Sequence, residues 1–161
     1  MMQAMDKRLF AFLALGAAFA SPLAAQQVRP CGDGGDFAYE TTAMAIAEPW
    51  ESNTRSFANG DIRITIMDTW EPALGAYYLM VLYWPAGDIA AEIRECSLVS
   101  NGELGFVGMT LEGLETRYDP ARGLVLNVPT TFYNPVEDEL EEGVLQVVID
   151  RKNQLIIATR P

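Results

Sequence analysis

The sequence contains no histidine and only two lysines among its 161 residues. Without an imidazole, the chain cannot build a Ser-His-Asp or Cys-His catalytic arrangement, and it lacks the nitrogen ligand typical of zinc and copper sites. Lys152 lies in a polar segment expected to be a hairpin tip, whereas a catalytic amine needs a desolvated setting. No P-loop or dinucleotide-binding fingerprint is present. We therefore predict a non-enzymatic protein with no catalytic residue, no metal site and no cofactor.

No hydrophobic run is long enough to span a membrane. The uncharged segment Leu9–Ala20 has twelve residues, whereas a spanning helix needs about 20. Two basic residues precede this segment and small residues follow it, which is the pattern of a cleaved signal peptide. We predict that residues 1–25 are removed after Ala25, with cleavage after Ala20 as the alternative. The expected location is the periplasm, or the extracellular space, with no membrane span in the exported chain.

Basic residues are scarce. The chain has 22 acidic and 11 basic residues, and the predicted signal contains Asp6, Lys7 and Arg8, so the exported part carries a net charge of −12. Nucleic acids require a basic face, so a nucleic-acid partner is excluded. The acidity serves solubility, and it also favours a basic protein as partner.

Cysteine occurs only twice, at Cys31 and Cys96. An even number of cysteines in an exported protein predicts a disulfide. The bond would close a long loop and contribute roughly 4 kcal/mol through the entropy of the unfolded chain. It would attach a glycine-rich leader, residues 26–36, to a single domain that spans residues 37–161.

Patterns of two-residue period dominate the rest of the chain. Asp61–Asp68 alternates isoleucine with other residues, and Ala76–Trp84 is apolar on both faces, as in a central strand covered on both sides. Turn signals follow at short intervals, and the clearest are Asn59-Gly60 and Asn101-Gly102. We predict an all-β fold, a mainly antiparallel sandwich or barrel of about eight or nine strands.

Two segments carry helical signals. Asn134-Pro135, the acids that follow and Gly143 predict one short helix near residues 135–142. Phe37–Glu48 combines helix-favouring residues with a strand-like spacing of apolar side chains, so the sequence leaves both structures open for it.

Three tryptophans stand beside carboxylates or prolines at expected strand ends. Flat aromatic rings beside acids are suited to stacking on a sugar or to anchoring a protein partner. The same rings would also plug the open end of a sandwich core. The candidate ligand-binding residues are Trp50, Glu51, Trp70, Glu71 and Trp84.

Three functional hypotheses remain open. The first is a small exported β domain that binds a protein or a cell-envelope component, for example an inhibitor of a basic enzyme such as a lysozyme. The second is a domain that binds or hydrolyses an envelope glycan through the tryptophans and their carboxylates. The third is a purely structural envelope protein.

Overall fold

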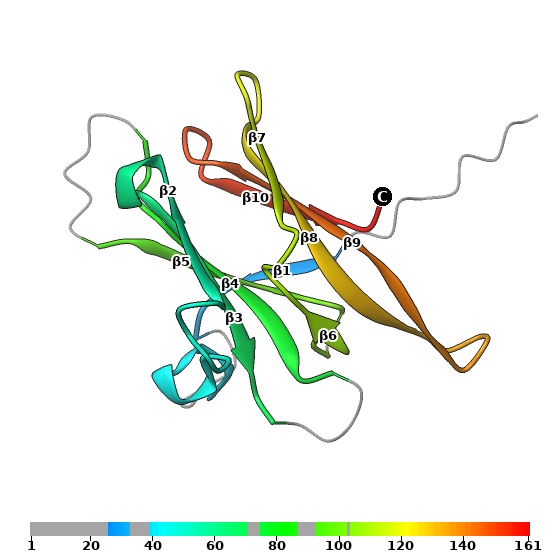
Figure 1. The fold of residues 1–161 in the computed structure, drawn as a ribbon. Helices are drawn as coiled ribbons and strands as arrows, with labels where there is room; N and C mark the ends of the chain where they lie inside the picture. Colours follow the sequence, from blue (N-terminus) through cyan, green and yellow to red (C-terminus); the bar gives the residue numbers. More distant parts are fainter. Residues whose placement is uncertain (1–25, 33–38, 71–74, 87–92, 103) are drawn as a thin grey trace, which may run out of the picture.

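The computed structural model describes residues 26–32, 39–70, 75–86, 93–102 and 104–161. Within these residues the chain forms ten strands in two five-stranded antiparallel sheets, which pack face to face in a sandwich-like fold (Figure 1). The predicted all-β, mainly antiparallel architecture is confirmed, with ten strands where about eight or nine were expected. Across these residues, no helix is long and apolar enough to cross a membrane. The predicted signal peptide and most of the glycine-rich leader lie outside the described residues.

The first sheet has the strand order β1-β5-β4-β3-β2. Its strands are β1 (Gln27–Pro30), β2 (Thr54–Phe57), β3 (Ile62–Asp68), β4 (Tyr77–Tyr83) and β5 (Glu95–Ser100). The strand that is apolar on both faces, β4, occupies the middle of this sheet, as its sequence predicts. It pairs with β3 from Ile62↔Tyr83 to Asp68↔Tyr77 and with β5 on its other side.

The second sheet has the order β10-β9-β8-β6, and β7 also pairs with β8. Its strands are β6 (Gly108–Met109), β7 (Glu115–Asp119), β8 (Gly123–Asn134), β9 (Glu139–Asp150) and β10 (Leu155–Thr159). The long β8–β9 ladder runs from Leu124↔Ile149 to Asn134↔Glu139. Its turn projects beyond the rest of the sandwich (Figure 1).

The main core lies between the inner faces of the two sheets. The three alternating isoleucines of β3 (Ile62, Ile64 and Ile66) are buried there against β8 and β9 side chains. Phe106 joins the sheets, because its backbone bonds to Tyr77 of the first sheet while its ring packs edge-on against Phe132 of the second, with ring centroids 5.7 Å apart.

Most predicted turns are where the sequence indicates. Asn59 and Gly60 both have positive φ between β2 and β3, and the Asp61 N–H donates to the Ala58 carbonyl at 3.1 Å. Gly123 ends the β7–β8 turn with φ of +91°. Asn101-Gly102 forms a tight turn closed by the Asn101↔Leu104 bridge, after which the chain crosses to the second sheet.

The predicted helix at residues 135–142 is wrong. Residues 135–138 form the turn of the β8–β9 hairpin, and β9 begins at Glu139. The Asn134 side-chain oxygen accepts the N–H groups of Val136 and Glu137 at 3.0 and 3.3 Å. An asparagine that caps a helix makes similar bonds, so the local signal serves both structures. The long strand pairing on either side selects the hairpin.

The segment for which the sequence left helix and strand open contains short pieces of both. The described part of Phe37–Glu48 forms two short 3-10 helices, η1 (Tyr39–Thr41) and η2 (Ala43–Ala45), followed by a single bridge from Ile46 to Met67. Tyr39 and Ala45 of these helices pack against Met80 and Leu98 and so cover part of the outer face of the first sheet.

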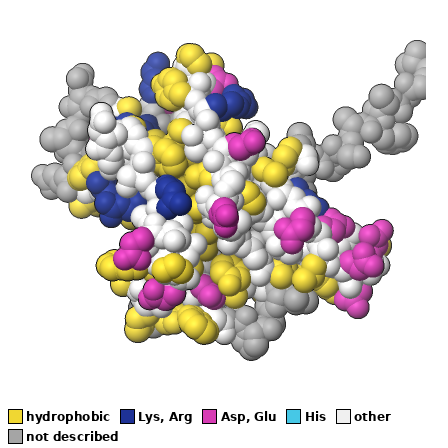
Figure 2. Space-filling model, in the orientation of Figure 1, with side chains coloured by type: hydrophobic (Ala, Val, Ile, Leu, Met, Phe, Trp, Pro, Cys, Tyr) yellow, Lys and Arg dark blue, Asp and Glu magenta, His cyan; other side chains and the backbone are white. Residues whose placement is uncertain are grey.

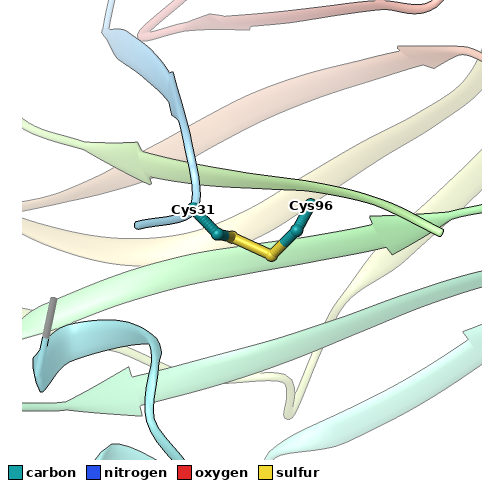
Figure 3. Close-up of a disulfide and its surroundings, with 2 residues drawn as sticks. All are labelled: Cys31 and Cys96. Atoms are coloured by element: carbon teal, nitrogen blue, oxygen red, sulfur yellow. A yellow bond between two sulfur atoms is a disulfide. The ribbon is translucent and has the colours of Figure 1, made fainter. Parts of the chain in front are cut away.

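The predicted disulfide between Cys31 and Cys96 is present, with the two Cα atoms 5.3 Å apart (Figure 3). It joins the residue after β1 to β5, and a backbone bond from the Cys31 N–H to the Cys96 carbonyl runs beside it at 3.0 Å. Both cysteines are half-buried in the small apolar cluster on the outer face of the first sheet.

Candidate functional site

Two of the three tryptophans are exposed. Trp50 shows 59% of its surface to solvent and Trp70 shows 75%, while Trp84 is half-buried. The interpretation of the tryptophans as plugs of the sandwich core therefore does not hold for Trp50 and Trp70. Glu71 lies outside the described residues.

Trp50 and Glu51 line a shallow groove on the outer face of the first sheet. Its volume is about 400 Å³. The other lining residues come from β2, β3, β4 and the segment after η2, namely Ile46, Thr54, Arg63, Thr65, Met80 and Leu82. Thr65 and Met80 are nearly fully buried, so they form the floor, whereas Trp50, Glu51 and Arg63 are exposed on the rim. We call this surface the Trp50 groove.

The loop that carries Trp50 is held in place by its neighbours. The Asn53 side-chain amide donates to the Ala47 and Pro49 carbonyls, and the Asn53 carbonyl accepts the Ile66 N–H at 2.9 Å. The Arg55 guanidinium donates to three loop carbonyls at 2.8–3.1 Å. An exposed indole on a fixed loop loses little conformational freedom on binding, which favours its use as an anchor.

The other tryptophans lie elsewhere. Trp70 follows the end of β3 and Trp84 follows the end of β4, and these are opposite ends of one antiparallel strand pair. The ladder between them has seven residue pairs, so at about 3.4 Å per residue its six steps separate the two positions by at least roughly 20 Å. Of the predicted ligand-binding residues that the structure describes, Trp50 and Glu51 line the groove, whereas Trp70 and Trp84 lie elsewhere.

Trp84 has structural contacts of its own. Its backbone N–H donates to the Asp61 carbonyl at 2.9 Å, and its backbone carbonyl accepts the Arg151 Nε–H at 2.6 Å. The Arg94 guanidinium lies 5.5 Å from the ring centroid, within the range of a cation–π contact. These contacts tie the end of the first sheet to the β9–β10 turn of the second.

The groove combines one aromatic ring, a floor made of Met80 and the polar Thr65, and one rim charge of each sign. Among the described residues, no group of three or more acidic or cysteine side chains is arranged to hold a metal ion. The ring of Trp50 and the side chains of Met80 and Leu82 suit the groove to packing against an apolar group of a partner. Glu51 and Arg63 on the rim are available to orient that partner.

The sequence indicated Trp50 and Glu51 but not the floor beneath them. Met80 and Leu82 belong to the strand whose two apolar faces predict cover on both sides. Among the described residues, η1 and η2 cover part of the outer face of the first sheet. Beside them, Met80 and Leu82 of β4 line the groove. Comparison of the chain with family models, with curated proteins and with solved structures finds no match.

Proposed function

We propose that this chain is an exported, non-enzymatic binding domain whose Trp50 groove receives an apolar side chain of a basic protein partner. The observation that carries the proposal is an exposed tryptophan on a fixed loop beside the apolar side chains of Met80 and Leu82. Protein interfaces concentrate their binding energy at such positions, where an aromatic anchor is surrounded by polar residues that exclude water.

Charge supports a basic partner. Only one arginine lines the groove, and the chain as a whole has a net charge of −11. A net negative field speeds the approach of a cationic protein and repels acidic ones, and its effect falls as salt is added. An inhibitor of a basic enzyme such as a lysozyme is one concrete form of this function, and the periplasm is its expected location.

Glycan binding is a further use of the same groove. A sugar site needs hydrogen-bonding side chains around its stacking ring, and Glu51, Thr54 and Arg63 could supply them, whereas Met80 and Leu82 favour contact with an apolar side chain. A carbohydrate-binding role is therefore the second candidate.

The test uses the immobilised protein with periplasmic extract and with purified lysozyme. Three forms are compared: the natural chain, Trp50→Ala, and Trp70→Ala as a control whose ring is also exposed but lies outside the groove. We expect a basic protein to be retained by the natural chain and by Trp70→Ala, to be lost with Trp50→Ala, and to be released by salt. Retention by all three forms contradicts the proposal. Binding of soluble peptidoglycan fragments in place of a protein would establish the second candidate.

A further inference from the structure

The end of the sandwich opposite the projecting β8–β9 turn contains a second and larger cavity. Its volume is about 690 Å³, within the range of sites for small ligands. It lies where the β2–β3, β7–β8 and β9–β10 turns meet (Figure 1). None of the tryptophans expected to plug a core end is among its lining residues.

The floor of this cavity is the unfilled end of the main core. Phe57 and Ile62 are cross-strand partners in the first sheet, and Leu124 and Ile149 are cross-strand partners in the second. Ile62 and Ile149 are almost completely buried, whereas Phe57 and Leu124 are half-buried. Of these four residues it is therefore Phe57 and Leu124, one from each sheet, that offer apolar surface to a ligand in the described part of the chain.

The mouth of the cavity is basic, although the protein is acidic. Arg117, Arg151 and Lys152 line it, against a single carboxylate, Asp150. Figure 2 shows a group of acidic side chains at the β8–β9 turn and others across the middle and lower left of this face, while the basic ones lie toward the ends of β7 and β2. The lining side chains alone carry more positive than negative charge, and Asp61 and Asp119, which pair with Arg151 and Arg117, lie just outside the lining.

The carboxylate in the lining is already satisfied within its own turn. Asp150 accepts the Asn153 side-chain amide at 2.6 Å and two backbone N–H groups at 3.1 Å. These donors, the Asn153 side chain first, hold the pKa of Asp150 below its ordinary value. The charge of Lys152 also lowers the pKa of Asp150, but the hydrogen bonds to this carboxylate come from Asn153 and from backbone N–H groups and not from the Lys152 ammonium.

Two of the three cations have unused binding capacity. Arg151 is engaged, since it pairs with Asp61 at 2.9 Å and also bonds the Trp84 carbonyl. Arg117 is half exposed and reaches a carboxylate only at 3.7 Å. Lys152 has no ion pair with any described residue. Both groups stand over an apolar cavity, where an anion would be partly shielded from water and held more strongly than at an open surface.

From this arrangement we infer that the open end of the sandwich binds an anionic amphiphile. Its apolar body packs against Phe57 and Leu124, above the buried Ile62 and Ile149, and its carboxylate or phosphate head meets Arg117 and Lys152. The site is separate from the Trp50 groove and does not depend on the function proposed for that groove.

The inference is tested by titration of the protein with four probes below their micelle concentrations. Decanoate and decyl phosphate carry the two possible heads on one apolar chain, decanol carries the chain without charge, and inorganic phosphate is a head alone. Binding is followed by calorimetry and by backbone amide shifts at the β7–β8 and β9–β10 turns. We expect decanoate or decyl phosphate, or both, to bind at least about tenfold more tightly than decanol or phosphate.

Three variants complete the test. The double charge reversal Arg117→Glu with Lys152→Glu should weaken the anionic probes by about tenfold or more and leave decanol unchanged. Ala121→Trp, at an exposed lining position, should fill the mouth and reduce the binding of every chain-bearing probe. Arg63→Glu makes the same kind of charge change in the Trp50 groove and should have no effect. Equal binding of decanol and decanoate, undiminished binding by the double variant, or no binding of either anionic amphiphile overturns the inference.

Discussion

Removal of the disulfide should lower the stability of the domain by about 4 kcal/mol. The change is the double variant Cys31→Ala with Cys96→Ala. The bond spans a sequence separation of 65 residues, and the chain-entropy relation for a loop of that size gives about 4 kcal/mol at 25 °C. A domain of this length is stable by roughly 5–15 kcal/mol, so the variant should still fold but with a much smaller margin.

Urea unfolding followed by circular dichroism measures the effect. With a slope of about 2 kcal/mol per molar urea, the midpoint should fall by about 2 M. The slope itself should rise, because an unfolded chain without the cross-link is more open and exposes more surface.

A matched control separates the cross-link from side-chain packing. Both cysteines contact the apolar cluster around Met80 and Leu98, so Cys31→Val with Cys96→Val retains apolar volume while it removes the bond. We expect this variant to be nearly as unstable as the alanine variant. A midpoint within about 0.5 M of the natural protein for either variant would refute the reasoning, since the loop estimate allows no such small change.

Three further predictions concern single residues. Gly123→Ala should destabilise by about 2–4 kcal/mol in urea unfolding, because a β-carbon there would lie 2.3 Å from a backbone oxygen of β9 at a φ of +91°. Gly102→Ala, also at positive φ but with no atom within 4 Å, should cost only about 1 kcal/mol, and equal losses at the two glycines would contradict the prediction. Phe106→Ala should cost about 3–5 kcal/mol, because the ring is fully buried between the sheets; a loss below about 1 kcal/mol in the same assay would show that the ring does not join them. Bonds from Arg160 first, and then from an asparagine side chain, hold the pKa of Glu141 below its ordinary value. Its contribution to stability is therefore present above the ordinary glutamate pKa and is lost as pH falls through the lowered value, so Glu141→Gln should be less stable than the natural chain at pH 7 and equal to it at low pH. Thermal unfolding from pH 7 down to pH 2 checks this prediction, and a stability difference that does not change with pH would contradict it.

The parts of the fold that the sequence predicts depend on strong local signals. The alternating isoleucines of β3 and the doubly apolar β4 specify strands because each face needs apolar cover. Asn59-Gly60 and Gly123 specify turns because few other residues adopt positive φ at low cost. The cysteine pair was predictable from number and the inferred export alone.

The parts that the sequence did not predict depend on long-range pairing. The acids after Pro135 are compatible with a helix, and only the strands on either side select a hairpin there. The partial cover of β4 could not be foreseen either, because the sequence shows that Met80 and Leu82 are apolar but not how far η1 and η2 extend over them. The cavity at the end of the sandwich also depends on long-range pairing. Phe57 and Leu124 both line it, but they are far apart in the chain and belong to different sheets.

Each sheet is built from one continuous half of the chain. The strands of the first sheet all lie between residues 27 and 100, and those of the second between residues 108 and 159. The disulfide lies wholly within the first half. Neither half can bury its inner face alone, because the core is shared between the two sheets. A cut in the Asn101-Gly102 turn would therefore divide the molecule into two mutually dependent fragments, each of which carries a complete apolar face that the other is shaped to cover.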